Sequence, residues 1–440
     1  MRALLLLVLV ASLITAPAAR AAPPAVAPVD VATRLLDALD AGRFDDASAG
    51  FTAQMRQALG TDALRGVWTS LPPPLSRGTP VVTAVGDMQL VVVPLRRQGA
   101  AVDAHVAVDR EGRVAGLRIT PAAAPPAPPV PADAAFTERD ARIGDGDAAL
   151  PGTLAMPKGE GSFPAVVLVH GSGPHDRDQS IGPNRPFLDI ARGLAARGIA
   201  VLRYEKRTRH RPQDFAGDFT MDTETTDDAV AAVSALRATP GIDPARVFVL
   251  GHSQGGMLAP RIAARSGQVA GVVMLAAPAR SLLDLLPEQN RFLFGLDGTL
   301  APAELAAIAR IEAQVANVRA ADAQPGAETP LGLPRAYWRA FDAIDPVADA
   351  RALRVPMLLL HGGRDFQVVE ADWRLWRQAF ADDPRATLRR FDALNHLGIA
   401  GSGPSSLDEY QTPAHVDATL IAAIADWIHA REVAPPPPRG

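Results

Sequence analysis

Short apolar runs alternate with helical patterns through the later part of the chain, and this alternation constrains the fold more than any other feature. The runs lie at Ala165–Val169, Ile199–Arg203, Val247–Leu250, Val269–Leu275 and Val355–Leu360. The helical patterns between them lie at Asp189–Ala196, Asp227–Ala238 and Met257–Ser266. Continuous apolar runs, rather than alternating ones, are typical of parallel strands buried on both faces. The pattern therefore predicts an α/β fold with a doubly wound, mostly parallel sheet.

The edges of this predicted domain, which spans residues 133–432, have patterns of their own. Two paired strands open it at Phe136–Ile143 and Leu150–Met156, and an apolar helix at Ala414–Ala430 closes it. Over about residues 281–345 the alternation breaks and helical patterns take its place. We expect this stretch to be a helical cap insertion over one end of the sheet.

A smaller predicted domain precedes it, over residues 28–120. Helical patterns run from Val29 to Trp68, and short strand patterns separated by turns follow from Val81 to Ile119. This order predicts a small α+β domain. Proline-rich stretches at 121–132 and 433–440 are typical of semi-rigid spacers, so we expect a linker and a tail there.

The N-terminus has the layout of a secretory signal peptide. Arg2 is followed by an apolar run at Ala3–Ile14, and the small-residue pattern Ala19-Arg20-Ala21 provides a cleavage site. The run is short for a membrane span, although an N-terminal anchor is the alternative interpretation. We therefore expect residues 1–21 to be removed from a bacterial protein that is periplasmic or secreted and has no stable membrane anchor.

Composition excludes several classes of protein. The net charge is -4, from 44 basic and 48 acidic side chains, so no basic excess is present to neutralise nucleic-acid phosphates. We therefore expect no nucleic-acid partner. The chain has no cysteine, which excludes disulfides, thiolate metal sites, a cysteine nucleophile and lipidation of an N-terminal cysteine.

A serine lies at the turn between a predicted strand and a predicted helix. Gly251-His252-Ser253-Gln254-Gly255 fits the pattern G-x-S-x-G and follows the apolar run Val247–Leu250. A serine at such a turn has strained backbone angles, and the flanking glycines keep neighbouring Cβ atoms away. Its Oγ is exposed at the start of a helix, whose amides stabilise developing negative charge. Ser253 is the predicted nucleophile, with an idle serine in a glycine-rich packing turn as the alternative.

A serine nucleophile needs a base, and in folds with this turn the base is a histidine that follows the acid in the chain. His396 lies in a loop just after the strand-like segment Thr387–Phe391, where a parallel sheet builds its site. His396 is therefore the predicted base. His415 and His429, at the start of the last predicted helix and inside it, are the alternatives.

The base in turn needs a carboxylate that orients it. Asp365 ends the segment His361-Gly-Gly-Arg-Asp365, one turn after the apolar run Val355–Leu360. This position also lies at the carboxyl end of a predicted strand, so Asp365 is the predicted acid. Asp345 and Asp392 are the alternatives.

The negative charge on a tetrahedral intermediate needs hydrogen-bond donors. The backbone amide of Gln254, directly after the nucleophile, is one predicted donor. The second is expected in the glycine-rich loop after the first parallel strand, where we choose the amide of Ser172 and keep that of Gly173 as the alternative.

The same loop is rich in side chains that bind metals in other proteins: His170, His175, Asp176 and Asp178. No matched ligand set occurs elsewhere in the sequence. We therefore expect no metal and no cofactor, and we expect Asp176, Arg177 and Asp178 to brace the loop.

Taken in order, several segments carry a family resemblance. They are His170–Asp178, Arg203–Arg207, Gly251–Gly256, His361–Asp365 and Leu394–His396. Over about residues 133–432 the chain resembles bacterial α/β-hydrolase-fold esterases of the dienelactone-hydrolase-like group. The resemblance implies the α/β-hydrolase fold, with Ser253 as nucleophile, Asp365 as acid and His396 as base.

Two further points concern this resemblance. Residues 28–120 resemble a small domain of unassigned role that precedes such hydrolases in secreted bacterial proteins. The chain departs from the family pattern at Arg207–Arg211, where a glycine-containing turn is usual.

The sequence thus predicts an exported serine hydrolase that cleaves small-molecule carboxylic esters through an acyl-enzyme intermediate. A serine peptidase or acyl-aminoacyl hydrolase is the alternative enzyme, because the same catalytic groups hydrolyse amides. A non-enzymatic envelope-binding protein is the alternative of another class. In the cap insertion, Phe292 and Phe294 are predicted to contact substrate, because pockets for small ligands are mostly apolar. The sequence leaves the oligomeric state open.

Overall fold

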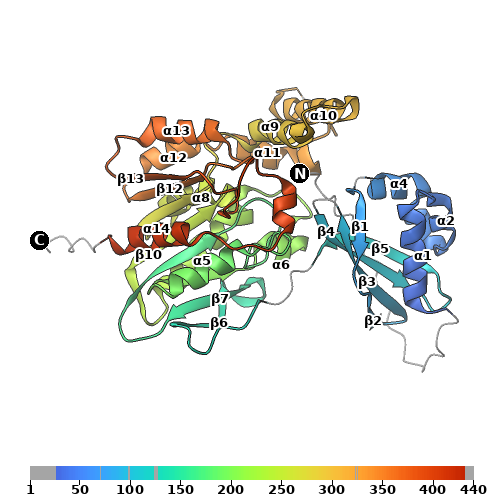
Figure 1. Cartoon of the computed structure of the whole chain (residues 1–440), viewed down its shortest axis with the longest axis horizontal. Coiled ribbons are helices and arrows are strands. Elements are labelled where there is room, and N and C mark those ends of the chain that lie inside the picture. Colours follow the sequence, from blue (N-terminus) through green and yellow to red (C-terminus); the bar gives the residue numbers. More distant parts are fainter. Residues whose placement is uncertain are drawn as a thin grey trace, which may run out of the picture. The chain divides into compact units, whose positions relative to one another are not determined.

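The computed structural model describes residues 26–69, 71–97, 100–122, 127–322, 324 and 326–431. The described residues form two compact units, one containing residues 26–122 and one built mainly from residues 127–431 (Figure 1). The predicted signal peptide, residues 1–21, and the predicted tail, residues 433–440, lie outside the described residues. Residues 123–126 of the predicted linker also lie outside them.

The N-terminal unit is a small α+β domain, as the sequence predicted. Its helices are α1 (Pro28–Asp40), α2 (Phe44–Ala49), α3 (Ala53–Ala58) and α4 (Thr61–Thr69). Its antiparallel sheet consists of β1 (Pro74–Arg77), β2 (Val81–Val85), β3 (Met88–Arg97), β4 (Ala100–Val108) and β5 (Val114–Pro121), in the order β1-β3-β4-β5, with β2 also paired to β3. Leu36 of α1 shares one core with Val91 of β3 and Val106 of β4.

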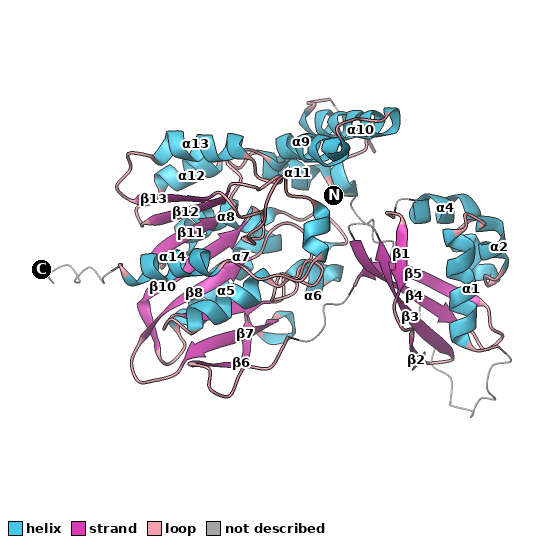
Figure 2. Ribbon diagram, viewed as in Figure 1, coloured by secondary structure: helices cyan, strands magenta, loops and turns pink. Residues whose placement is uncertain are grey.

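The second unit is built on an 8-stranded sheet. Its strands are β6 (Phe136–Ile143), β7 (Leu150–Pro157), β8 (Phe163–Val169), β9 (Ala200–Tyr204), β10 (Ile242–His252), β11 (Gly271–Leu275), β12 (Met357–Gly362) and β13 (Ala386–Phe391). Their order is β13-β12-β11-β10-β8-β9-β7-β6 (Figure 2). β7 runs antiparallel to β6 and β9, and the other neighbouring pairs are parallel. The predicted mostly parallel sheet is confirmed.

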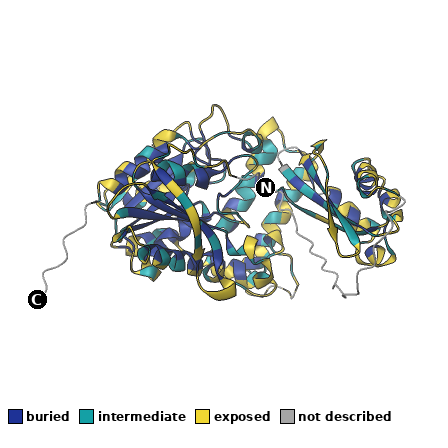
Figure 3. Cartoon of the chain, turned by 90° about the horizontal axis from the view of Figure 1, so that it is seen from below, coloured by how far each residue is buried: buried dark blue, intermediate teal, exposed yellow. Residues whose placement is uncertain are grey.

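Helices cover both faces of this sheet, so it is doubly wound. One face carries α5 (Pro186–Ala195) and α14 (Ala418–His429). The other carries α7 (Asp227–Arg237), α8 (Gln254–Ser266), α12 (Pro346–Ala352) and α13 (Glu370–Phe380). The central strands between these layers are buried, as the dark blue ribbons of Figure 3 show.

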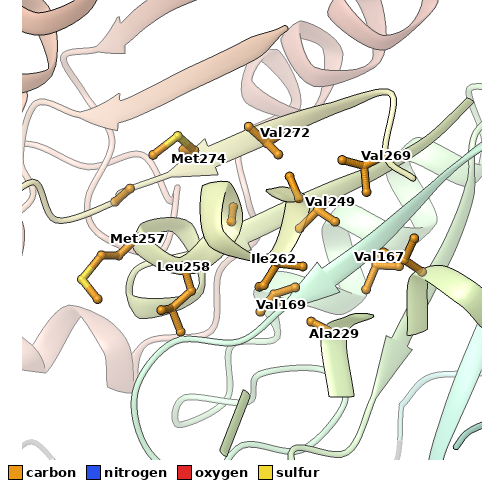
Figure 4. Packing of buried hydrophobic residues seen from close by; sticks show 14 of the residues in the cluster. Val167, Val169, Ala229, Val249, Met257, Leu258, Ile262, Val269, Val272 and Met274 are labelled. Carbon is orange, nitrogen blue, oxygen red and sulfur yellow. The ribbon is translucent and has the colours of Figure 1, made fainter. Parts of the chain in front are cut away.

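Alternate residues of each central strand supply two different cores. In β8, Val167 and Val169 pack in the core under α7 and α8, whereas Val166 packs under α5 and α14. Figure 4 shows the first of these cores, where Ile262 of α8 lies among Val249 and Val169 of the sheet. Burial on both faces is the reason that these strands appear in the sequence as continuous apolar runs.

The stretch between β11 and β12 is helical, as predicted for the cap insertion. Within residues 281–345 its α-helices are α9 (Leu282–Phe294), α10 (Pro302–Arg319) and α11 (Arg335–Asp342), and α12 follows before β12. Leu283 and Trp338 of this insertion are buried in the same core as α7 and α8. Phe292, by contrast, keeps 36% of its surface exposed. The insertion is therefore anchored in the core and also presents apolar side chains outward.

Element ends differ from the sequence-based prediction for local reasons. Asp417 accepts a hydrogen bond from the amide of Thr419 as an N-cap, so α14 begins at Ala418 rather than at Ala414. The short segments α6 (Arg207–His210) and η3, a π-helix (Asp222–Thr226), lie between β9 and α7. None of the helices in the described ranges has the length and apolar character that a membrane crossing requires.

Candidate active site

The nucleophile turn connects β10 to α8. Ser253 lies between them with φ 54 and ψ -120, a region that residues other than glycine rarely adopt. A Cβ on Gly251 would overlap the backbone of Gly255, and a Cβ on Gly255 would overlap the carbonyl oxygen of Val169. The two glycines of the motif therefore permit a turn that leaves Ser253 at the end of β10.

The structure brings Asp365 and His396 together. They follow the neighbouring parallel strands β12 and β13, so both lie beyond the carboxyl ends of these strands. His396 Nδ1 donates to Asp365 Oδ2 over 2.7 Å, and both residues are buried. The amides of Gln367 and Val368 donate to Asp365 Oδ1 over 2.8 and 2.9 Å.

These contacts keep the Asp365 carboxylate ionised. Burial alone raises its pKa, because a charged group loses hydration. The attraction of His396 and the hydrogen bonds to the carboxylate outweigh this effect, and the pKa of Asp365 lies below its ordinary value. Because the carboxylate accepts a hydrogen bond from Nδ1, the neutral tautomer of His396 has its proton on Nδ1 and its lone pair on Nε2.

His252, directly before the nucleophile, connects the nucleophile turn to the histidine loop. Its Nε2 donates to the backbone carbonyl of His396 over 2.7 Å, and the two rings lie 4.7 Å apart. The side-chain amide of Gln179 donates to its Nδ1, also over 2.7 Å. Burial and, less strongly, the proximity of His396 lower the pKa of His252 to about 3, so the ring is neutral. The backbone of His396 is thereby held beside the residue that precedes Ser253.

The alternative bases occupy other places. His415 lies before α14 on the surface, where its Nδ1 bonds to Asp189 over 3.0 Å. His429, the last residue of α14, donates from Nε2 to the carbonyl of Arg197 over 2.8 Å. Both histidines therefore have partners on or near α5, away from Asp365.

The alternative acids also have local partners. Asp345 caps α12 by accepting a hydrogen bond from the amide of Ala348 over 2.9 Å. Asp392 is exposed and pairs with Arg390, two residues earlier in the same segment. Asp365 is thus the candidate acid that the fold brings to His396.

The oxyanion loop, residues 170–179 after β8, lies against the nucleophile turn. A Cβ on Gly171 would lie 3.3 Å from the Cβ of Ser253. Gln254 is the first residue of α8, so its amide has no acceptor within the helix. Within the described ranges, the amide of Ser172 also has no hydrogen-bond acceptor. Both predicted oxyanion donors therefore have N–H groups available beside the nucleophile turn.

Polar side chains of this loop bond to its own backbone. His175 Nε2 donates to the carbonyl of Ser172 over 2.8 Å, and His170 Nε2 donates to that of Asp176 over 3.0 Å. Asp176 accepts from the amide of Asp178. Burial lowers the pKa of His175 to about 4. Among the residues that the structure describes, no three His, Asp or Glu side chains are grouped to hold a metal ion.

Gly171 is held at both backbone groups by buried side chains for which no role was predicted. Gln179 Oε1 accepts from the Gly171 amide over 2.9 Å, and Lys206 Nζ donates to the Gly171 carbonyl over 2.8 Å. Gln179 has φ 51, a strain that only the structure reveals. For Lys206 the sequence does offer a signal, because lysine is rare in this chain. Only Lys158 and Lys206 are lysines among its 44 basic residues, and the others are arginines.

The cap insertion contacts the loop that carries Asp365. Phe292 stacks on Phe366, with ring centroids 5.4 Å apart, and Gln289 Nε2 donates to the carbonyl of Gln367 over 2.7 Å. Phe292 thus lies beside the residue that follows Asp365. Phe294, the other predicted substrate residue, is partly buried at the end of α9.

A strained serine between strand and helix, on a doubly wound sheet of this order, defines the class of protein: it is a hydrolase of the α/β-hydrolase fold. The family model described as serine aminopeptidase, S33, matches residues 163–397, and the chain belongs to this family. The predicted fold class and family resemblance are confirmed.

The chain is also similar to individual proteins that are named esterases. The chain is 37% identical over 396 residues to esterase EstD of Thermotoga maritima. The alignment covers 89% of this chain and 92% of that protein. Among solved structures, Est1E from Butyrivibrio proteoclasticus is 17% identical, with a TM-score of 0.42 over 66% of this chain and 98% of that one. The Pyrococcus furiosus esterase Pf2001 is 19% identical, with a TM-score of 0.42 over 62% of this chain and 88% of that one.

The neutral state of His252 leads to a prediction about stability. Between its ordinary pKa of 6.5 and its folded pKa of about 3, the unfolded chain binds a proton at this residue that the folded chain does not bind. The free energy of unfolding therefore falls as the pH falls through this window, by up to about 1.4 kcal/mol per pH unit for this residue. We expect His252→Gln to show a shallower decline between pH 7 and pH 5 in urea unfolding than the wild type does.

His415→Gln, at an exposed position, is the matched control, and its decline should equal that of the wild type. An unchanged slope for His252→Gln would show that His252 takes up its proton in the folded state as readily as in the unfolded chain.

Proposed function

We propose that the protein is an exported serine hydrolase that cleaves carboxylic esters of small molecules through an acyl-enzyme intermediate. The observation that carries this proposal is the buried 2.7 Å bond between His396 and Asp365, together with the strained turn at Ser253. The esterase EstD, to which the chain is 37% identical, supports esters as the substrate class.

The catalytic cycle follows from the roles of these groups. Ser253 Oγ attacks the ester carbonyl and passes its proton to His396 Nε2, while Asp365 holds the other ring nitrogen protonated. The amides of Gln254 and Ser172 donate to the resulting oxyanion. The tetrahedral intermediate expels the alcohol, which takes the proton from Nε2, and an acyl-enzyme remains. A water molecule activated by His396 then releases the carboxylic acid and regenerates Ser253.

Amides are the alternative substrate class, and the family description, serine aminopeptidase, favours testing them. An aminopeptidase substrate carries a free ammonium, which a carboxylate at the site has to bind. Glu224 is a buried carboxylate that is linked to the oxyanion loop through Lys206. It is already paired with the ammonium of Lys206 at 2.7 Å. This pairing favours esters whose acyl part carries no ammonium.

The triad assignment is tested by substitution. We expect Ser253→Ala to abolish p-nitrophenyl acetate hydrolysis and fluorophosphonate labelling, and His396→Ala to lower kcat by at least about a thousandfold, since triad members act as a unit. His415→Ala, at the exposed alternative position, should retain the wild-type rate. Near-wild-type turnover by Ser253→Ala would refute the assignment of Ser253 as nucleophile. A separate assay, which compares a graded series of esters with aminoacyl p-nitroanilides, decides between esters and amides.

We further propose that Phe292 and Phe294 contact the acyl part of the substrate. In support, Phe292 keeps 36% of its surface exposed while its ring stacks on Phe366, beside the acid. We expect Phe292→Ala to change the ratio of kcat/KM between butyrate and acetate esters with little change in melting temperature. Leu285→Ala, at a buried position of the same helix, should lower the melting temperature and leave that ratio unchanged. The reverse pattern would assign Phe292 to the core.

Export is the remaining part of the proposal. The charged start, apolar run and small-residue site of residues 1–21 support cleavage by a signal peptidase and a periplasmic or secreted location. We expect the mature chain in a periplasmic or culture fraction to begin at Ala22. N-terminal sequencing measures this directly, and retention of Met1 on a membrane-bound protein would favour an anchor instead.

A further inference from the structure

We propose that Lys206 is a positioning residue for the oxyanion hole: its buried ammonium binds the carbonyl end of the peptide whose N–H is the second oxyanion donor. This inference rests on the proposed function, in which the amide of Ser172 is that donor. It assigns to Lys206 an electrostatic role in the reaction that no triad residue performs.

The contacts of Lys206 are well defined. The residue is 2% exposed and follows β9, the strand beside β8. Its Nζ donates to the carbonyl of Gly171 over 2.8 Å and to Glu224 Oε1 over 2.7 Å. The other oxygen of Glu224, which is also buried, accepts a hydrogen bond from Tyr337 of the cap insertion over 2.9 Å.

The geometry of one peptide unit connects Lys206 to the oxyanion. The carbonyl of Gly171 and the amide of Ser172 belong to the same planar unit, and in a trans peptide they point in opposite directions. A cation on the carbonyl oxygen fixes the direction of the N–H group. It also polarises the unit, because electron density drawn toward the oxygen leaves the N–H a stronger donor. The ammonium of Lys206 thus acts on the N–H donor of Ser172 from the opposite end of the same peptide unit.

The Lys206–Glu224 ion pair has the orientation that polarises the Gly171 carbonyl. Its positive end meets the Gly171 carbonyl, and its negative end is turned toward Tyr337. Within a buried site, where screening by water is weak, such an oriented dipole stabilises negative charge on the far side of the peptide. Developing charge on the oxyanion is therefore favoured, whereas a neutral ester carbonyl in the ground state gains little.

The shape of the loop does not depend on Lys206 alone. Gln179 holds the Gly171 amide over 2.9 Å, and His175 holds the Ser172 carbonyl over 2.8 Å. A second observation concerns residue choice: arginine serves almost every other basic position of this chain, but this buried position has lysine. Lysine places a compact point charge on one carbonyl, whereas the wider guanidinium suits paired acceptors. Both observations indicate that Lys206 contributes its positive charge to the site and does not only hold the shape of the loop.

The test removes the charge pair without leaving a buried charge unpaired. In K206M/E224Q both side chains stay similar in size and neither is ionised. We expect kcat for p-nitrophenyl acetate, per site labelled by fluorophosphonate, to fall about tenfold with KM nearly unchanged, less than the hundredfold or more for a lost direct donor. We expect Ki for a trifluoromethyl ketone, whose adduct with serine carries an oxyanion, to rise by a similar factor.

The adjacent ion pair provides the matched control. Arg207 pairs with Asp228 over 2.6 Å and with Asp214 over 3.3 Å, and it also contacts the carbonyl of Ala148. None of these partners belongs to the oxyanion loop. R207M/D228N should lower the melting temperature without changing kcat or the ketone Ki. A purely structural role for Lys206 would make the two double variants behave alike, and wild-type kcat and Ki in K206M/E224Q would overturn the inference.

Two further outcomes are also decisive. If K206M/E224Q does not fold, K206Q/E224Q decides, because it keeps a hydrogen-bond donor beside Gly171 and carries no charge. A tenfold loss of kcat then supports the inference, and a wild-type kcat overturns it. If the wild-type protein hydrolyses no ester or amide, the proposed function fails and this inference fails with it; wild-type turnover combined with unchanged variants refutes the inference alone.

Discussion

The close approach of the nucleophile turn to the end of β8 is the constraint on which the rest of the site depends. Gly255 lies so near the carbonyl groups of Val169 and His170 that any side chain there would overlap them. This contact places the strained backbone of Ser253 beside Gly171, with which the oxyanion loop begins to turn. The proposed nucleophile and the proposed oxyanion donors are thus brought together by backbone packing between two adjacent parallel strands, β8 and β10. The strain at Ser253 persists because the sheet on both sides determines the position of the turn.

A chain of buried hydrogen bonds then fixes the loops relative to one another. It runs from the Gly171 amide through the side chains of Gln179 and His252 to the backbone of His396. Each donor in this series of hydrogen bonds has one acceptor when His252 is neutral and carries its proton on Nε2. Protonation of His252 would place a second proton against the amide group of Gln179, and burial accordingly lowers the pKa of His252 to about 3. The oxyanion loop and the loop that carries His396 are therefore coupled by a network that does not titrate near neutral pH.

The sequence was most informative where structure is local or repeated. The central strands are visible as apolar runs because both faces are buried, and Ser253 is visible because a strained turn requires the glycines around it. Asp365 and His396 could be placed because parallel strands end at a common edge. The network of Gln179, Lys206, Glu224 and Tyr337 could not be predicted, because its members come from separate segments and each bond depends on tertiary packing. The strand β1 has no alternating pattern because its residues are largely exposed, and the start of α14 is set by the cap at Asp417.

The ion pair of Lys206 and Glu224 is hard to explain by stability. Removing two charges from water has a desolvation cost that their attraction often fails to recover, and apolar replacements of similar volume are commonly as stable. The neighbouring pair of Arg207 and Asp228 has a different arrangement, in which the arginine keeps contact with solvent. Lys206 instead directs its charge at a single carbonyl beside the nucleophile, and Tyr337 satisfies the remaining oxygen of its partner. Because Tyr337 belongs to the cap insertion, this insertion has two connections to the site: one through Glu224 and Lys206 to the oxyanion loop, and one through Phe292 and Phe366 to the acid loop. If both proposed roles hold, a substitution within α11 alters the rate of the chemical step and one within α9 alters the fit of the acyl chain.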